Sequence, residues 1–221
     1  MPLNNLQAII WDLDNTLYRF DGDFENLCTV AAAKAVIKSG INMSYEEAFS
    51  YCQKSYDEYG HSYYLVIKEH QIDQHQIHFD YHSFIDETVI KKSIELIELM
   101  DQAPYKHVLV THASFEWASR SLSHLGLKKF FSDDMIIPAE AIDFSRKSES
   151  TKPFLEALKK LETDIDHTIV IEDLANNLKI PKEMGLSTAL VHYGRPPNPK
   201  PDYIDYFCNN AIEFLELAMA S

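Results

Sequence analysis

Short, mainly apolar runs recur at wide spacing along this chain, and they limit its fold more than any other feature. The runs fall at residues 6–11, 107–110, 135–137, 168–171 and 188–191. Runs of this length without alternation are typical of strands that are buried on both faces, as in a parallel sheet. Helical patterns lie between them, at residues 115–125, 151–161 and 175–184. Strands that alternate with helices of this length predict an α/β fold with a parallel sheet.

The stretch at residues 20–100 breaks this alternation. It contains no convincing run for a buried strand, and its amphipathic helical patterns fall at residues 24–38, 45–59 and 83–100. Such a stretch is too long for a simple crossover between neighbouring strands. We therefore predict an inserted helical cap at residues 20–100 and a core formed by residues 1–19 and 101–221.

Charge and cysteine content exclude several classes of protein. The 34 acidic side chains outnumber the 20 basic ones, which argues against a nucleic-acid polymer as partner, because phosphate backbones are bound by clustered Lys and Arg. Cys28, Cys52 and Cys208 are far apart and form no CxxC pair, so neither a zinc knuckle nor a disulfide framework is predicted. An acidic enzyme can still bind a small phosphate where a metal makes its site locally positive.

The first residues, MPLNNLQAIIWDLD, lack the basic start of a signal peptide. No apolar run in the sequence approaches membrane-spanning length. Sparse cysteines without a pattern are typical of a reducing compartment. We therefore expect a cytoplasmic protein without a membrane partner.

Polar residues follow three of the predicted strands, where ligands bind in open parallel sheets. These residues are Asp12 and Asp14 after the first run, Thr111 and His112 after the second, and Glu172 and Asp173 after the fourth. Lys152 begins the helix that leads into the fourth strand. Carboxylates that meet in one place repel each other unless a cation neutralises them. An oxygen-rich site of this kind suits Mg²⁺.

The spacing of Asp12 and Asp14 has a chemical reading. Residues two apart just past a strand can point the same way while Leu13, between them, turns into the core. One carboxylate can then attack phosphorus while the other gives and takes a proton, and aspartate is a known nucleophile for phosphoryl groups. Lys152 and the Thr111 hydroxyl would stabilise the phosphoryl oxygens.

Four segments, DLDNTLY, VTHAS, STKP and VIEDLANN, resemble in this order the four motifs of the haloacid dehalogenase-like (HAD) hydrolase superfamily. The resemblance runs from Asp12 to about Gly185, with the insertion where that superfamily's helical cap belongs. It implies a Rossmann-like core and a site that holds Mg²⁺. The roles implied are nucleophile for Asp12, general acid/base for Asp14, phosphate-binding hydroxyl for Thr111, motif-three lysine for Lys152 and acidic Mg²⁺ ligand for Asp173.

The same resemblance implies that Asp12 binds the metal through its carboxylate and Asp14 through its backbone carbonyl. Two positions depart from the pattern. His112 stands where many relatives have Asn, although its backbone N–H could still bind phosphate, and Glu172 precedes Asp173 where Asp or Gly is commoner. We therefore assign Glu172 to the surroundings of the metal. The cap segments KSYDEYG and HQID resemble the pyrimidine 5′-nucleotidase branch.

Each of these residues also has an ordinary structural explanation. The aspartates could form a turn, Lys152 could be a solvated helix start, and Glu172 with Asp173 could cap the next helix. His78 and His82 have the spacing of a metal pair, but no recognised motif surrounds them.

The combined prediction is a Mg²⁺-dependent phosphomonoester hydrolase that forms a phospho-aspartate. We expect it to act on a small phosphorylated metabolite, with a nucleoside monophosphate as the first expectation. The alternatives are a phosphatase for sugar phosphates or other metabolites, a dehalogenase, a receiver-like signalling module and a catalytically idle binding protein.

Overall fold

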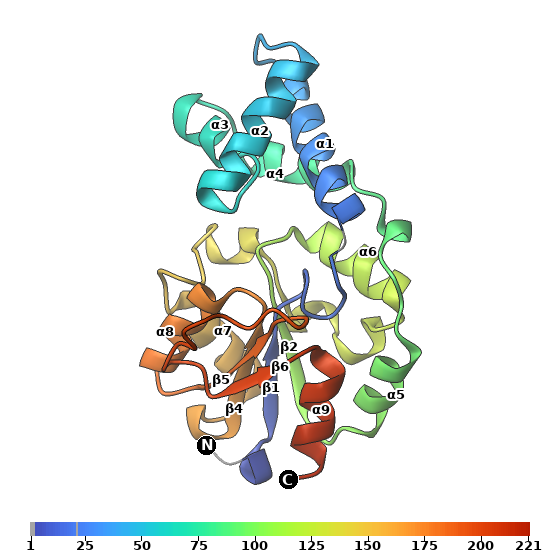
Figure 1. The fold of residues 1–221 in the computed structure, drawn as a ribbon, viewed down its shortest axis with the longest axis vertical. Coiled ribbons are helices and arrows are strands. Elements are labelled where there is room, and N and C mark those ends of the chain that lie inside the picture. Colours follow the sequence, from blue (N-terminus) through green and yellow to red (C-terminus); the bar gives the residue numbers. More distant parts are fainter. Residues whose placement is uncertain (1–2, 21) are drawn as a thin grey trace. The chain divides into compact units, whose positions relative to one another are not determined.

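The computed structural model describes residues 3–20 and 22–221 of the chain. Within these residues, one six-stranded sheet has the order β3-β2-β1-β4-β5-β6, and all its paired strands are parallel (Figure 1). The strands are β1 Ala8–Trp11, β2 Lys106–Val110, β3 Ile136–Ile137, β4 Thr168–Glu172, β5 Ser187–Val191 and β6 Tyr206–Cys208. The predicted α/β fold with a parallel sheet is therefore confirmed. Strand order reverses beside β1, and this is where open α/β sheets bind ligands.

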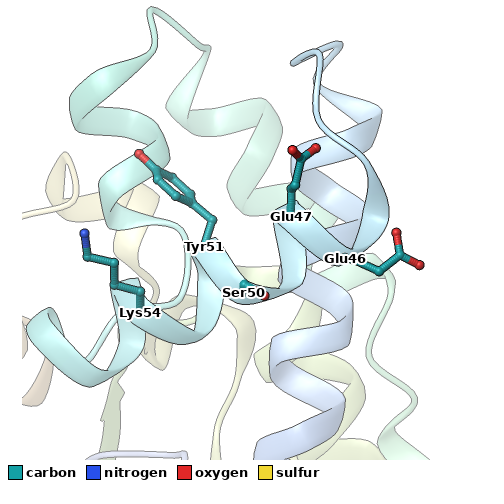
Figure 2. A pocket seen from close by; sticks show the side chains of 5 residues that line it. All are labelled: Glu46, Glu47, Ser50, Tyr51 and Lys54. Carbon is teal, nitrogen blue, oxygen red and sulfur yellow. The ribbon is translucent and has the colours of Figure 1, made fainter.

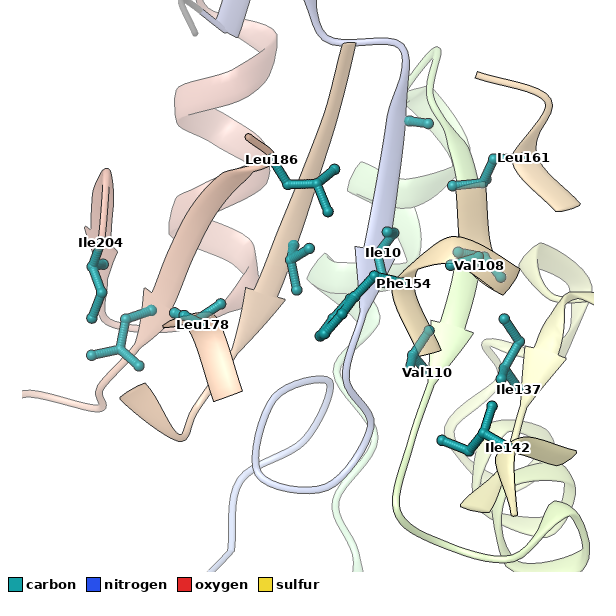
Figure 3. Close-up of a cluster of buried hydrophobic side chains, with 14 residues drawn as sticks. Ile10, Val108, Val110, Ile137, Ile142, Phe154, Leu161, Leu178, Leu186 and Ile204 are labelled. Atoms are coloured by element: carbon teal, nitrogen blue, oxygen red, sulfur yellow. The ribbon is translucent and has the colours of Figure 1, made fainter. Parts of the chain in front are cut away.

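Alternate side chains of each strand face opposite sides of the sheet and build two buried layers. On one side, Ile10 of β1 and Val108 of β2 pack with Phe154 of helix α7, Lys152–Leu161 (Figure 3). On the other side, the ring of Trp11 meets Phe214 of α9, Ala211–Met219, edge to face at 6.2 Å between centroids. Burying each large apolar side chain stabilises the fold by roughly 1.5–3 kcal/mol.

The helices that follow the strands lie close to their predicted positions. Helix α6, Phe115–Leu125, has the predicted limits, and α7 begins one residue after its predicted start. The predicted helix at 175–184 is instead a 3-10 turn at Ala175–Leu178 followed by α8, Lys179–Glu183. Pro181 explains the division, because proline lacks the N–H that a helix interior needs but is tolerated in a first turn.

The insertion forms a compact unit of its own, Phe20–Ile90, and the remaining unit is Met1–Arg19 with Lys91–Ser221. The helices of the insertion are α1 Gly22–Lys38, α2 Tyr45–Tyr59, α3 Tyr64–Glu69 and α4 Gln74–Ser83, with a 3-10 turn at Glu87–Val89. Ala32 and Val36 of α1 pack with Ala48 and Cys52 of α2 in a separate apolar core. At the start of α2, Ser44 and Glu47 form a reciprocal capping box.

The second boundary of the insertion lies ten residues before the predicted one. The single helix predicted at 83–100 is wrong: α4 ends at Ser83, and α5 occupies Ile94–Gln102. The Ser93 hydroxyl accepts a hydrogen bond from the Leu96 backbone N–H at 3.2 Å and so starts α5. Helix α5 packs against α9 and belongs with the sheet.

Two polar features of the insertion are a surface pocket and a pair of histidines. A surface pocket on α2 is lined by Glu46, Glu47, Ser50, Tyr51 and Lys54, all from this one helix (Figure 2). His78 Nδ1 lies 2.6 Å from the Tyr63 hydroxyl, and His82 Nδ1 lies 2.8 Å from the His78 carbonyl oxygen. These partners of His78 and His82 are thus groups of the insertion itself. Among the described residues, no helix combines the length and apolar character that crossing a membrane requires.

Candidate active site

The chain makes a tight turn immediately after β1, and this turn brings Asp12 close to Thr16 and Asp14 close to Tyr18. The turn is closed by a hydrogen bond from the Leu17 N–H to the Leu13 carbonyl at 3.0 Å. The Thr16 hydroxyl donates to Asp12 Oδ2 at 2.9 Å. Leu13 itself is fully buried, so the core anchors the residue between the two aspartates.

Asp12 shares a buried lysine with Glu172. The Lys147 ammonium lies 2.6 Å from Asp12 Oδ1 and 2.5 Å from Glu172 Oε1. Its third hydrogen-bond acceptor is the Val110 carbonyl at 3.3 Å. The three donors of the ammonium are thus all used, which is what a lysine side chain only 2% exposed requires.

The lysine predicted for this place, Lys152, lies elsewhere. It is the first residue of α7, it is exposed, and its ammonium pairs with Asp143 at the surface. The reason is the orientation of α7, because the side chains that this helix buries, Phe154 and Ala157, lie on its opposite face. The structure therefore corrects the predicted site: Lys147, five residues earlier, contacts Asp12.

The loop before α7 carries Lys147 inward. Asp143 and Phe144 both adopt left-handed backbone conformations, with φ of 51° and 54°. His112 Nε2 accepts a hydrogen bond from the Lys147 backbone N–H at 3.2 Å. His112 was predicted to bind phosphate through its backbone N–H; its ring makes a separate contact, which ties the lysine loop to the end of β2.

Glu172 and Asp173 leave the end of β4 beside Asp12, whose backbone N–H donates to the Ile171 carbonyl at 3.0 Å. Glu172 Oε1 also accepts from Asn177 Nδ2 at 2.7 Å, and its Oε2 accepts from the Leu174 N–H at 2.8 Å. Both oxygens of Glu172 are therefore engaged by protein donors.

Asp173 is bound from the turn after β1. Its Oδ2 accepts from Asn15 Nδ2 at 2.8 Å. Asn15 has a φ of 59°, a conformation that asparagine adopts more readily than most residues. The turn that orients Asp12 thus also orients Asp173.

Asp12, Glu172 and Asp173 form the one group of potential metal ligands found among the described residues, with carboxylate oxygens within 4.8 Å of one another. Burial raises the pKa of Asp12, and the Lys147 charge opposes that rise. Burial also raises the pKa of Asp173 well above its usual range, and repulsion from Glu172 adds to the rise. Three carboxylates face one ammonium, so the ammonium does not balance their negative charge. A hard cation could supply the missing positive charge.

Asp14 has different surroundings. Its Oδ1 accepts from the Tyr18 hydroxyl at 2.5 Å and from Trp117 Nε1 at 3.0 Å. Burial raises the pKa of Asp14, and the two hydrogen bonds oppose that rise. The nearest hydrogen-bonding groups to this carboxylate are neutral, in contrast to those of Asp12.

Thr111 is fully buried one residue past the end of β2. Its hydroxyl oxygen accepts a hydrogen bond from the Ala113 N–H at 3.0 Å, which folds the chain back before α6. The preceding carbonyl, of Val110, is the one that binds Lys147. Lys152 differs from the other predicted residues in that its ammonium pairs with Asp143 at the surface.

Known proteins resemble this chain in sequence and in fold. The family model described as haloacid dehalogenase-like hydrolase matches residues 9–191, a range that contains every site residue named above. The glyceraldehyde 3-phosphate phosphatase of Methanocaldococcus jannaschii is 24% identical and aligns over 96% of this chain and 96% of its own length.

Solved structures share the fold. A HAD phosphatase from Thermococcus onnurineus has a TM-score of 0.64 at 15% identity, covering 96% of this chain and 97% of its own. A HAD hydrolase of Bacillus subtilis, described as bound to magnesium, has a TM-score of 0.61 at 17% identity, covering 96% and 98% of the two chains. At this identity the structural likeness concerns the fold alone.

Proposed function

Since this chain belongs to the haloacid dehalogenase-like hydrolase family, we propose that it hydrolyses phosphomonoesters of small metabolites with Asp12 as the nucleophile. The observation that carries this proposal is the buried Asp12 carboxylate, held by Thr16 and Lys147 where the strand order reverses. A phosphatase among its relatives of similar length supports the reaction class.

The first step transfers the phosphoryl group to the enzyme. A carboxylate oxygen of Asp12 attacks phosphorus, and the bond from phosphorus to the ester oxygen breaks. The departing oxygen takes a proton from Asp14, so that an alcohol is released and Asp14 remains in the site as a carboxylate. Asp12 then carries the phosphoryl group as an acyl phosphate.

The second step restores the enzyme. Asp14, now ionised, takes a proton from water as the water oxygen attacks phosphorus. The bond between phosphorus and Asp12 breaks, which releases inorganic phosphate and regenerates both side chains. Lys147 holds the Asp12 carboxylate in place and lies where it can offset charge on the phosphoryl oxygens.

The residues present fit a divalent cation, because oxygen ligands converge in a cluster with more negative than positive charge. We propose that the carboxylates of Asp12 and Asp173 and the backbone carbonyl of Asp14 hold Mg²⁺. Glu172 would stay an outer group, since Lys147, Asn177 and the Leu174 N–H occupy its oxygens. Bound there, Mg²⁺ would offset the charge that the phosphate brings to the carboxylates.

Two substrate classes have specific support. The phosphatase relative acts on glyceraldehyde 3-phosphate by its name, which favours a small sugar phosphate. The cap resemblance favours a nucleoside monophosphate, and Tyr45 and Tyr56 of α2 are exposed rings on which a base could stack. Stacking contributes roughly 1–3 kcal/mol per base, and about 1.4 kcal/mol is a tenfold preference.

The test has two parts. Enzyme quenched in acid during turnover should carry phosphate on the peptide that contains Asp12, and Asp12→Asn should carry none and lose several orders of magnitude of turnover. Retention of more than a few per cent of activity in Asp12→Asn would contradict the proposal. Comparing kcat/KM for glyceraldehyde 3-phosphate, UMP, CMP and AMP, each with and without chelator, then decides the substrate class and the need for metal.

A further inference from the structure

One oxygen of Asp14 receives two hydrogen bonds from uncharged donors, one from Tyr18 four residues along the chain and one from Trp117 of α6. The Tyr18 hydroxyl lies 2.5 Å and the Trp117 Nε1 3.0 Å from Asp14 Oδ1. Both donors are buried, with 4% of Tyr18 and 1% of Trp117 exposed. Neither bond brings a charge to the carboxyl group, so both act through geometry.

Local structure fixes each donor. Tyr18 lies four residues after Asp14, in the tight turn that follows β1. Trp117 is the third residue of α6, where the Ser114 hydroxyl caps its backbone N–H at 3.2 Å. Side chains of a helix lean toward its N-terminus, which directs the indole of Trp117 toward the ends of the strands.

We propose that Tyr18 and Trp117 are positioning residues that assign the transferable proton of Asp14 to Oδ2 and aim it at the leaving group. Because Oδ1 accepts two hydrogens, the proton of the neutral carboxyl group occupies the other oxygen. This inference rests on the proposed function, in which Asp14 is the acid of the first step and the base of the second.

The consequence is a dependence on the leaving group. When an alkyl phosphate reacts, the breaking bond leaves an alkoxide oxygen that must take the proton from Asp14 Oδ2. When p-nitrophenyl phosphate reacts, the departing phenolate is stable without that proton. A variant in which the Asp14 carboxyl group is wrongly oriented should therefore hydrolyse the alkyl ester more slowly, with a smaller effect on the aryl ester. A general loss of packing should slow the hydrolysis of both esters alike.

The experiment measures kcat/KM of the wild type, Tyr18→Phe and Trp117→Phe on p-nitrophenyl phosphate and on the better of glyceraldehyde 3-phosphate and UMP. General acid catalysis contributes about 10²–10⁴-fold, so each variant should lose about 10-fold or more on the alkyl ester and clearly less on the aryl ester. Asp14→Asn should also lose more kcat/KM on the alkyl ester than on the aryl ester, and both the losses and their difference should be larger. Tyr105→Phe is the matched control, because it also removes one tyrosine hydroxyl. Tyr105 lies just before the start of β2, and its hydroxyl donates to the Ala218 carbonyl at 2.9 Å and not to Asp14.

Equal losses on the two esters, or no loss on either, would overturn the positioning role. Should Trp117→Phe unfold, Tyr18→Phe decides, since it removes a single oxygen from the protein. A wild-type enzyme that hydrolyses neither ester would instead refute the proposed function, which keeps the two failures distinct.

Discussion

Asp12 and Asp14 stand two residues apart on one turn, yet their surroundings differ in kind. Asp12 is held by an ammonium group, which favours the ionised form that a nucleophile needs. Asp14 is held by a phenol and an indole, uncharged donors whose hydrogen bonds can be made to a neutral or to an ionised carboxyl group. The comparison shows how one short loop can supply two carboxylates with different tasks, because their partners come from different elements of the fold.

Among the groups that hold the two aspartates, the largest effect is expected from the cation on the Asp12 side. Lys147→Met should lower kcat by about 10²–10³-fold, as loss of one preorganised charge partner does, and equally for alkyl and aryl esters. Lys152→Met is the matched control and should stay near wild type, because its ammonium pairs with Asp143 at the surface. Steady-state kinetics checks both, and a larger loss in Lys152→Met would contradict the assignment.

Breaking a buried ion pair also costs stability, by about 3–5 kcal/mol. Thermal unfolding of Lys147→Met must therefore accompany its kinetics. Lys147→Arg gives a second measurement, since it keeps the charge while changing its geometry. If Lys147→Arg is folded but has a low kcat, the loss of activity comes from altered geometry in the site and not from unfolding.

The correction from Lys152 to Lys147 shows where sequence reasoning reached its limit. Lys152 precedes a proline and fits a motif, whereas Lys147 lies in a polar stretch without periodicity. The apolar spacing of Phe154, Ala157 and Leu161 already places Lys152 on the outer face of α7. The inward path of Lys147 could not be predicted, because it depends on left-handed conformations at Asp143 and Phe144 and on a bond to His112.

A second prediction separates the two acids after β4. Asp173→Ala should raise the Mg²⁺ concentration needed for half-maximal activity by about 100-fold or more, while Glu172→Gln should change it less. Loss of an outer-shell partner typically costs metal sites about 10–100-fold. Titration of activity against Mg²⁺ measures both, and equal shifts would mean that Glu172 is itself a ligand.

A third prediction concerns the histidine that ties the lysine loop. His112→Leu removes the acceptor of the Lys147 N–H and should lower activity about tenfold on both esters. His112→Gln should recover most of that loss, because its amide oxygen can take the place of Nε2. If leucine and glutamine behave alike, the ring serves as packing and the hydrogen bond at 3.2 Å has no effect on Lys147.

The fold was more predictable than the site because burial leaves a periodic record in sequence. Apolar runs located β1, β2, β4 and β5, and the limits of α6 and α2 were predicted to the residue. The end of the insertion was missed, since Ser93 starts α5 within a stretch that reads as one amphipathic pattern. Partners such as Trp117 with Asp14 leave no local pattern, because 103 residues separate them.

The smallest effect is expected from the neutral donor on the Asp12 side. Thr16→Val keeps the shape of the side chain but removes the hydroxyl that donates to Asp12 Oδ2. Because Lys147 still holds Oδ1, the loss should be a few-fold, consistent with about 0.5–1.5 kcal/mol for one neutral hydrogen bond. Thr16→Ser retains the hydroxyl and should stay near wild type. The loss should be the same for p-nitrophenyl phosphate and for an alkyl phosphate, since Asp12 attacks phosphorus in both. A loss confined to the alkyl ester would mean that Thr16 acts on the proton carried by Asp14, and the division of labour between the two aspartates would then be wrong.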